Sequence, residues 1–437
     1  MGRLLKGANI NKLSRKQLYM RFKILVLALL LPLVTWAQET KKESPLSFYG
    51  FVRNDFYLDT YKGVNAFHDL FYLYPNYIGV DANGEDINRQ TSANLLSIVT
   101  RFGVNINGPQ VFGAKTTGCI EADFAGKPEV YLLRLRKAYM QFNWEKSQLL
   151  VGQTWHPFWG GSAFPQTGSL NTGSPFTPFN RSPQVRFDYK IGHLTLNAAA
   201  IYQQQYVSSG PSGNSNIYKR DAVLPESVLG LEYSKNGVTL GAGLDYSSIK
   251  PRVTTAGSNG KIFKSDEVLG SMSYMAYGKY AKDKLMVLLK GYYGQNMSHL
   301  TMLGGYGVAS YDATTGHETY TNYNAYYTVF NITYGKKWKP GLFVGYLKNL
   351  GTSDALHPFG AVGKETATTY GSATNIQNMY RVSPSIAYTV PKFSLVTEYE
   401  MTGANFGEGT FDFGDGLYSS THLAVNHSLR LVMTYFF

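Results

Sequence analysis

The stretch LRLVMTYFF, residues 429–437, decides the fold of this chain. Side chains along an extended strand alternate between two faces. One face of this stretch is apolar and ends in aromatic rings: Leu429, Leu431, Met433, Tyr435 and Phe437. The other face is mixed and carries the charge of Arg430. Because a soluble domain usually ends in a frayed, polar tail, the pattern predicts a strand that continues to the last residue.

The composition agrees with a strand-built membrane protein. Of the 437 residues, 16% are charged, against roughly 25% in ordinary soluble domains. Aromatic residues make up 15%, with 34 Tyr and 25 Phe, yet the hydrophobic total is only 44%. A helical membrane protein would be far more apolar, whereas a barrel exposes only every second residue of a strand to lipid. The composition therefore favours a transmembrane β-barrel.

The N-terminal segment predicts export. Within MRFKILVLALLLPLVTWAQ, residues 20–38, Arg21 and Lys23 precede an apolar run over residues 24–34. That run is shorter than the ~20 residues of a spanning helix, and Ala37 follows it at a plausible cleavage site. Residues 1–37 are thus a predicted secretory signal peptide. Residues 1–19 are either an over-extended start, with Met20 as the initiator, or an unusually long leader; the first interpretation is favoured.

Charge and cysteine usage exclude two classes of protein. Seven of the 41 Lys and Arg residues lie in the signal peptide, which leaves 34 bases against 29 acids. This small excess gives no reason to expect nucleic-acid binding. A single cysteine, Cys119, excludes an intrachain disulfide framework. Because Cys119 is far from the cleavage site, a lipoprotein anchor is not expected, and no motif indicates a cofactor.

After the signal, candidate strands recur and the connections between them alternate between long and short. About sixteen strands are predicted, at residues 47–59, 94–107, 116–126, 130–142, 148–155, 184–190, 193–205, 227–234, 238–248, 268–280, 285–295, 325–338, 342–351, 380–390, 393–403 and 421–437. This layout predicts an all-β, transmembrane antiparallel barrel with short periplasmic turns and long extracellular loops. Residues 38–45 would be a short periplasmic segment and residues 46–437 the barrel. The last strand must then pair with the first, since no strand edge stays unpaired in lipid. The terminal Phe437 also resembles the assembly signal of outer-membrane barrels.

The hairpin CIEADFAGKPEVYLLRLRKAY, residues 119–139, shows what the lumen carries. Alternation places Glu121 and Asp123 on the same face as Arg134 and Arg136. A tight turn around Pro128 places Asp123 opposite Arg134 and Glu121 opposite Arg136. On the lipid face each arginine would cost ~2–4 kcal/mol near the midplane. The four charges are therefore predicted to face the lumen.

Further charged residues fall on inward faces: Arg53, Asp55, Arg101, Arg186, Asp188, Arg381 and Arg430. Two interpretations are equally open. The pairs either neutralise a polar interior or form a constriction that attracts anions, because rings of arginine favour anion passage. Gly103, Gly241 and Gly243, also on inward faces, predict open space in the lumen.

One part of the sequence resembles a known family. The motifs EADFAG (121–126), LRLRKAYMQF (133–142) and LLVGQTWHPF (149–158) resemble the third-to-fifth strand region of the DcaP-like porins. The resemblance implies a sixteen-stranded, trimeric outer-membrane channel for small anionic and dicarboxylic solutes. It also implies that Arg134 and Arg136 line the pore, beside Glu121 and Asp123. The WAQ ending of the signal, residues 36–38, is similar to exported proteins of Bacteroidota. Expected partners are outer-membrane lipid and lipopolysaccharide, two further copies of the chain and small anions.

The connection over residues 156–182 is nearly uncharged and rich in Gly, Pro and Phe. Two positions are equally open: it either folds inward and narrows the channel or stays outside. Its start, TWHPFW (154–159), resembles a platform for sugar stacking, but an interfacial aromatic cluster at a strand end is the favoured interpretation.

Other functions are less well supported. The eight histidines are scattered, and His422 and His427 fall on opposite strand faces, so no catalytic or metal-ligand spacing is evident. We therefore expect no enzyme. A plugged receptor barrel would need a plug domain before the first strand, and the sequence leaves no room for it. A structural or adhesive barrel with a filled interior remains the alternative to an outer-membrane porin.

Overall fold

A computed structural model describes residues 44–67, 69–127 and 131–437. The predicted signal peptide, and all but the last two residues of the predicted segment 38–45, lie outside the described residues. The chain divides into two units, Met1–Pro45 and Leu46–Phe437, and all strands of the described residues belong to the second. Within the described part of the chain, no helix is both long enough and apolar enough to cross a membrane.

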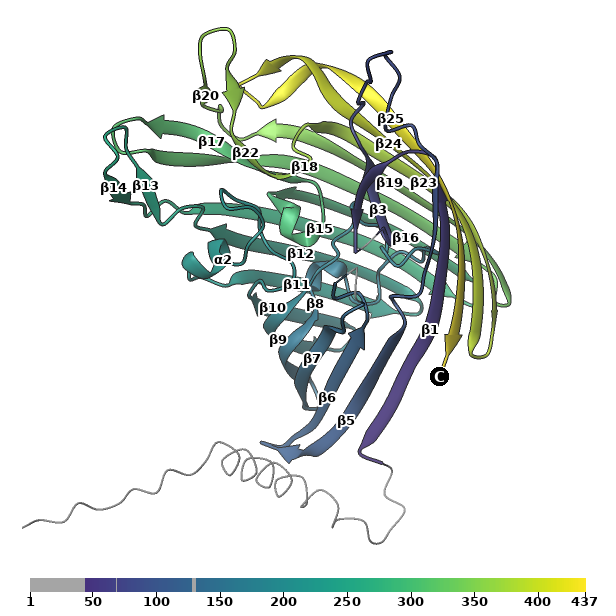
Figure 1. Cartoon of the computed structure of the whole chain (residues 1–437). Helices are drawn as coiled ribbons and strands as arrows, with labels where there is room; N and C mark the ends of the chain where they lie inside the picture. Colours follow the sequence, from purple (N-terminus) through teal and green to yellow (C-terminus); the bar gives the residue numbers. More distant parts are fainter. Residues whose placement is uncertain (1–43, 68, 128–130) are drawn as a thin grey trace, which may run out of the picture. The chain divides into compact units, whose positions relative to one another are not determined.

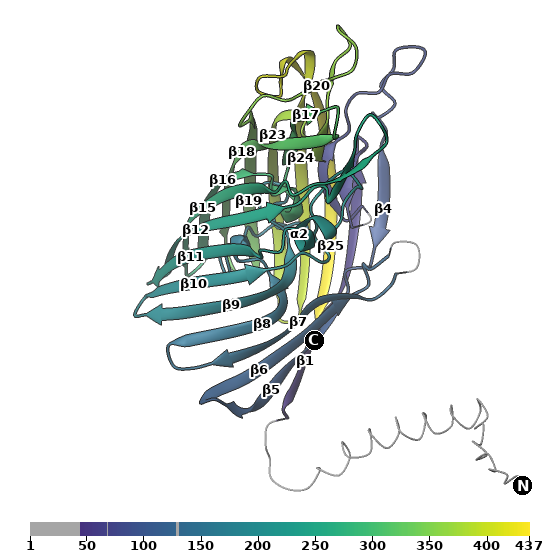
Figure 2. The same ribbon diagram turned by 90° about the vertical axis from the view of Figure 1, so that its left-hand side faces the viewer.

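The second unit is a closed antiparallel barrel of sixteen strands, as the sequence predicts. In Figures 1 and 2 the strands lie side by side in sequence order. The barrel strands are β1 (Leu46–Asp59), β5 (Arg101–Val111), β6 (Ala114–Asp123), β7 (Arg134–Asn143), β8 (Ser147–Trp155), β9 (Arg181–Ile191), β10 (Leu194–Ile201), β11 (Glu226–Lys235), β12 (Val238–Ile249), β15 (Leu269–Lys282), β16 (Leu285–Gln295), β18 (His317–Tyr334), β19 (Trp338–Thr352), β23 (Ile376–Val390), β24 (Phe393–Asp412) and β25 (Leu417–Phe436).

Closure is made by the first and last strands. β1 pairs with β25 from Phe51 opposite Phe436 to Asp59 opposite Ser428. On its other edge β1 pairs with β5 and then with the short strand β4 (Ser92–Leu96), so the second wall strand is interrupted between them. Every strand edge inside the barrel is thereby paired, as a lipid environment requires.

Side-chain burial confirms the predicted faces of β25. Leu431 is 41% exposed and Met433 46% exposed on the outer face, whereas Arg430 and Val432 are each 1% exposed on the inner face. Exposed aromatic rings form two belts on the outer surface, as in other membrane barrels. The belt near the short turns contains Tyr189, Tyr233, Tyr280, Tyr334, Trp338, Tyr435 and Phe437, and the belt near the long connections contains Tyr246, Tyr274, Tyr293, Tyr346 and Tyr399.

The short turns lie where the sequence predicts them. Lys235 pairs with Val238, so Asn236 and Gly237 alone make the turn between β11 and β12. Both have positive φ, 52° and 84°, which is the backbone that a two-residue hairpin turn requires and that Asn-Gly adopts readily.

The opposite end of the barrel contains more strand than predicted. β24 and β25 continue to Asp412 and from Leu417, so the predicted long loop between residues 403 and 421 is a hairpin. Its turn ends in Asp415-Gly416, and the positive φ of Gly416 supports the sharp reversal.

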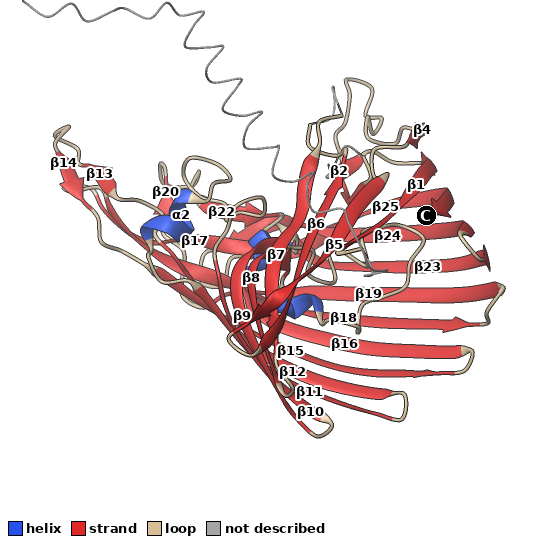
Figure 3. Ribbon diagram, turned by 90° about the horizontal axis from the view of Figure 1, so that it is seen from below, coloured by secondary structure: helices blue, strands red, loops and turns tan. Residues whose placement is uncertain are grey.

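Short elements complete the described chain, most of them at the long-loop end, and Figure 3 shows how few are helical. They are β2 (Gly63–Ala66), β3 (Phe71–Pro75), β13 (Thr254–Ala256), β14 (Ile262–Lys264), β17 (Gly304–Asp312), β20 (Pro358–Phe359), β21 (Thr366–Ala367), β22 (Thr369–Ser372), α2 (Ile217–Asp221) and the 3-10 turns η3 (Pro157–Trp159) and η4 (Met297–Leu300).

The connection between β6 and β7 also differs from the prediction. β6 ends at Asp123 and β7 begins at Arg134, so the two strands are separated by more residues than the predicted tight turn contains. Pro128, on which the predicted turn centres, lies outside the described residues.

Candidate functional site

The loop between β8 and β9, residues 156–180, enters the lumen; we call it the inward loop. The backbone N–H groups of Gly168 and Ser169 donate to the carboxylate of Glu398 on β24, at 2.7 and 3.0 Å. From β1, Nη2 of Arg53 donates to the carbonyl of Gly168 at 2.8 Å. Because Glu398 and Arg53 are inner-wall residues of strands distant from β8 in sequence, the inward interpretation of this loop is correct.

A second segment, the β2–β3 hairpin, also contacts the inner wall. Nη2 of Arg381 donates to the carbonyls of Tyr72 and Leu73, at 2.8 and 3.0 Å. Arg430 donates to the carbonyl of Leu70 at 3.2 Å. These residues lie between the predicted strands 47–59 and 94–107, where the sequence predicts only a long connection. The unbroken apolar run Leu70–Tyr74, which is buried throughout, is the signal that could have revealed it.

The predicted charge pairs of β6 and β7 come together. Nη2 of Arg134 and Nη1 of Arg136 each lie 2.8 Å from Oδ2 of Asp123, and Nε of Arg136 lies 2.9 Å from Oε1 of Glu121. The predicted register is confirmed for Asp123 opposite Arg134. It is wrong for Glu121, which lies opposite Lys137 because a β-bulge inserts one extra residue. The bulge lets both Arg136 and Lys137 reach Glu121.

Neighbouring strands extend this set into one group, the inner-wall cluster: Arg53, Asp55, Arg101, Glu121, Asp123, Arg134, Arg136 and Lys137. Arg53 is paired with Asp55 at 2.5 Å, and Nε of Arg101 lies 3.8 Å from Glu121. Five bases thus face three acids. Their side chains are 22% exposed or less, so the cluster is a packed, positively charged section of wall.

Arg181 is a further basic residue that the sequence analysis did not select. It is fully buried, and its guanidinium carbon lies 4.6 Å from the Trp155 ring centroid and 5.1 Å from that of Phe179. Nη2 donates to the hydroxyl of Tyr206 at 2.6 Å, whereas Nε and Nη1 have no hydrogen-bond partner among the described residues. Contacts with the faces of these aromatic rings stabilise the buried guanidinium group.

Cavities lie on two sides of the inward loop. One, of about 520 Å³, lies toward the short turns and is lined by charged and aromatic residues that include Arg186, Asp188, Lys190, Trp155, His156 and Trp159. The other, of about 400 Å³, lies toward the long loops and is lined by residues that include Tyr74, Tyr206, Asn214 and His299. The lumen is therefore hollow on both of these sides of the inward loop.

The aromatic residues of TWHPFW lie inside the barrel, so the favoured interfacial interpretation is wrong. Trp155 and Trp159 stack at 4.4 Å, and Phe164 stacks on the other face of Trp159 at 4.4 Å. Arg181 lies over Trp155. Because both faces of Trp159 are covered by rings, the alternative of a sugar-stacking platform does not fit Trp159 either.

The three inward glycines do not mark open space. The Tyr49 ring lies over Gly103, the Tyr277 ring over Gly241, and Phe158 of the inward loop over Gly243. Each glycine makes room for a ring on the neighbouring element, which is a packing role.

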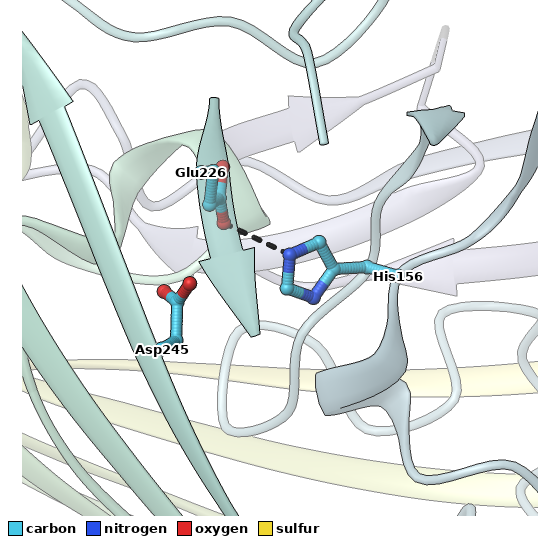
Figure 4. A group of neighbouring side chains, drawn as sticks. All are labelled: His156, Glu226 and Asp245. Carbon is cyan, nitrogen blue, oxygen red and sulfur yellow. Dashed lines mark hydrogen bonds and ion pairs between the residues drawn. The ribbon is translucent and has the colours of Figure 1, made fainter. Parts of the chain in front are cut away.

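One buried group of titratable residues was missed by the sequence analysis. His156, Glu226 and Asp245 have ligand atoms within 4.8 Å of one another, and Figure 4 shows the imidazole of His156 directed at Glu226. On another side, Nε2 of His299 lies 3.1 Å from Oε1 of Glu226. The histidines come from separate connections, so only folding brings them to one carboxylate.

This group does not fit a metal site. The backbone N–H of Phe158 donates to Nδ1 of His156 at 3.2 Å, so the proton of the neutral ring is on Nε2, the atom that points at Glu226. A metal-binding histidine instead donates its second ring N–H to an acceptor. Nearby, burial lowers the pKa of Lys219, and the negative charges of Glu226 and Asp245 oppose that shift.

Comparison with known proteins supports the fold. No protein-family model and no curated protein sequence matches the chain. Among solved structures, the outer membrane channel DcaP of Acinetobacter baumannii is similar with a TM-score of 0.62 at 17% identity, over 91% of this chain and 99% of that one. OmpT, an outer membrane protein of Vibrio cholerae, gives 0.53 at 11% identity, over 91% and 100%. An anion-selective porin from Comamonas acidovorans gives 0.50 at 7% identity, over 90% and 99%. The chain therefore has the fold of the DcaP-like outer-membrane porins.

Proposed function

We propose that this chain is an outer-membrane porin that passes small hydrophilic solutes by diffusion and favours anions such as small carboxylates. The observation that carries the proposal is the excess of basic over acidic side chains in the inner-wall cluster of a closed barrel. Arg134 and Arg136 are the residues proposed to set the selectivity, with Arg53 and Arg101 beside them and Glu121, Asp123 and Asp55 as their partners.

Electrostatics supports the preference for anions. Five bases and three acids leave two positive charges in excess, and the buried Arg181 adds another without a carboxylate among its hydrogen-bond partners. In a low-dielectric wall such an excess acts on a passing ion more strongly than it would in water. Basic rings favour anion passage through a pore for the same reason.

The proposal includes an environment and an assembly. The chain would be exported with removal of its signal peptide after Ala37 and would insert among outer-membrane lipid and lipopolysaccharide. There it would assemble as a homotrimer, and it would have no enzymatic activity. The mass of the detergent-solubilised, folded protein would decide the oligomeric state, and sequencing of its N-terminus would decide the cleavage site.

The function is tested by the reversal potential across a KCl gradient in a planar bilayer. The expected result is an anion-selective potential that falls toward zero when Arg134 and Arg136 are both replaced by Ala. Arg220→Ala is the matched control, because its side chain is 69% exposed on α2. The control should keep the original potential.

Other outcomes point elsewhere. Conductance without selectivity, unchanged by the double substitution, would leave a general porin in which the charge pairs are structural. A folded barrel with no conductance under any condition would favour the alternative of a structural or adhesive barrel. One observation supports this alternative: the inward loop and the β2–β3 hairpin both occupy space in the lumen.

A further inference from the structure

Two connections far apart in the sequence meet at one carboxylate oxygen. His156 begins the inward loop, and His299 lies in η4, which follows β16. Nε2 of His156 lies 2.9 Å from Oε1 of Glu226, and Nε2 of His299 lies 3.1 Å from the same oxygen. Because Glu226 begins the wall strand β11, a single oxygen joins both connections to the barrel wall.

This joint lies between the two cavities. His156 lines the cavity toward the short turns, and His299 lines the cavity toward the long loops. All three side chains are almost fully buried, so the joint is part of the partition that separates the cavities. The carbonyl of His299 also accepts a hydrogen bond from Nδ2 of Asn180, at the end of the inward loop. Movement of the joint would therefore affect both connections.

The hydrogen bonds of His156 determine which of its ring nitrogens carries the proton. Because the N–H of Phe158 donates to Nδ1 of His156, the neutral ring must donate its Nε2–H to Glu226. A second proton on that ring can only bind Nδ1, where it would face the N–H of Phe158. Protonation of His156 thus removes the side-chain cap of η3. A proton on either imidazole makes the ring cationic, and its hydrogen bond to the carboxylate of Glu226 becomes an ion pair. Proton uptake by a histidine therefore strengthens the joint to Glu226.

Two further titratable groups, Asp245 and Lys219, lie beside Glu226. Oδ1 of Asp245 has no hydrogen-bond partner among the described residues. Nζ of Lys219 donates to the carbonyl of Ser248 at 3.1 Å. Lys219 and Glu226 bring opposite charges into this buried site. A proton taken up by His156 or His299 is held beside the carboxylate of Glu226, so the site is suited to bind a proton as the pH falls.

We propose that His156, Glu226 and His299 form an acid-sensitive latch. At neutral pH the latch holds the inward loop and η4 against the wall through hydrogen bonds. Proton uptake by a histidine turns one of these bonds into an ion pair, which tightens the latch and restricts the passage between the two cavities. The electrical readout of this inference rests on the proposed porin function, but the movement of the loop does not, and the experiment separates the two.

The experiment measures single-channel conductance and hydrogen exchange of peptides from residues 156–180. When the pH is lowered from about 7.5 to about 5, the range in which imidazole titrates, conductance is expected to fall about twofold or more. Exchange of the inward loop, corrected for the intrinsic effect of pH, should fall in parallel. In the double variant His156→Gln, His299→Gln, each glutamine keeps an N–H donor but cannot titrate. Neither quantity should then change between the two pH values.

Two further variants sharpen the test. Glu226→Gln removes the negative charge that both imidazoles share and should raise loop exchange at both pH values. His422→Gln is the matched control, because its Nδ1 lies 3.7 Å from Glu408 at the exposed rim, in another histidine–glutamate pair. This control should keep the full pH response.

The outcomes are distinct. A full pH response in the double variant, or loop exchange that does not change with pH in the unmodified protein, would overturn the latch. Loop exchange that responds through the two histidines in a barrel without conductance would support the latch and refute the porin. If micromolar Zn²⁺ slowed the hydrogen exchange of the inward loop, and this effect were lost in the double variant, the two histidines would form a cation site and the latch would be refuted.

Discussion

Asp123 on β6 lies directly opposite Arg134 on β7, and its carboxylate, which is fully buried, binds two guanidinium groups. Arg134 approaches from the facing strand position and Arg136 from the bulge that follows it. This arrangement makes Asp123 the acid on which the packing of the inner-wall cluster depends.

Asp123→Asn should destabilise the barrel strongly. The substitution removes the charge that two buried arginines share, and breaking a buried pair by removing one partner costs about 3–5 kcal/mol. Unfolding by guanidinium, followed by tryptophan fluorescence, measures the loss. Asp188→Asn is the control, because Asp188 and its partner Arg186 are 19% and 25% exposed, and such partly solvated pairs contribute about 0–1 kcal/mol. Equal losses in the two variants would contradict the central role of Asp123.

Gly241→Ala should be destabilising although it lies in a regular strand. A Cβ there would lie 2.1 Å from the Tyr277 ring, whose hydroxyl donates to Glu232 at 2.6 Å. Overpacking of this kind costs about 1–3 kcal/mol, and the same unfolding measurement detects it. Gly291→Ala is the matched control, because its nearest neighbour would be at 3.7 Å. The packing argument fails if both variants unfold at the same denaturant concentration.

Leu431→Arg should test the orientation of the terminal strand. Leu431 is exposed on the outer face of β25, where an arginine near the midplane costs about 2–4 kcal/mol. Tyr435→Arg, at the interfacial end of the same face, should cost about 0–1 kcal/mol. Folding equilibria in lipid vesicles compare the two. A larger cost at Tyr435 than at Leu431 would be inconsistent with the outer face described above.

A disulfide between Gly168→Cys and Glu398→Cys should form if the inward loop crosses the lumen. A Cβ on Gly168 would lie 3.1 Å from that of Glu398, a few tenths of an ångström short of the ~3.5–4.5 Å of a disulfide. Cys119→Ser provides the background, since Cys119 is the one native cysteine. Mass spectrometry of the oxidised protein should find the cross-linked peptides.

The control for this cross-link pairs Glu398→Cys with Gly260→Cys, a position with no neighbour within 4 Å. It should stay reduced under the same conditions. Efficient cross-linking at Gly260, or none at Gly168, would place the loop elsewhere.

Some of the candidate site could be predicted and some could not. The alternation around Asp123 and Arg134 places both on the inner face, and their pairing follows from it. The partner of Glu121 could not be predicted, because a bulge changes the register by one residue without a mark in the sequence. The His156–Glu226–His299 group was missed because its members come from separate strands and loops. Arg181 was missed for the same reason, since its partners Trp155, Phe179 and Tyr206 come from different segments.

The sequence by itself determined the closed barrel, the number of strands, the short turns and the outer face. These features depend on period-two alternation and on turn residues such as Asn236-Gly237, which are local properties of the chain. Only the tertiary structure decided what fills the lumen. The inward loop, the β2–β3 hairpin and η4 are placed by hydrogen bonds to wall residues such as Arg53, Arg381 and Glu398. Those contacts, and the one between His299 of η4 and Glu226, join residues that are 73 to 309 positions apart, and no local pattern specifies which inner-wall group a loop will meet.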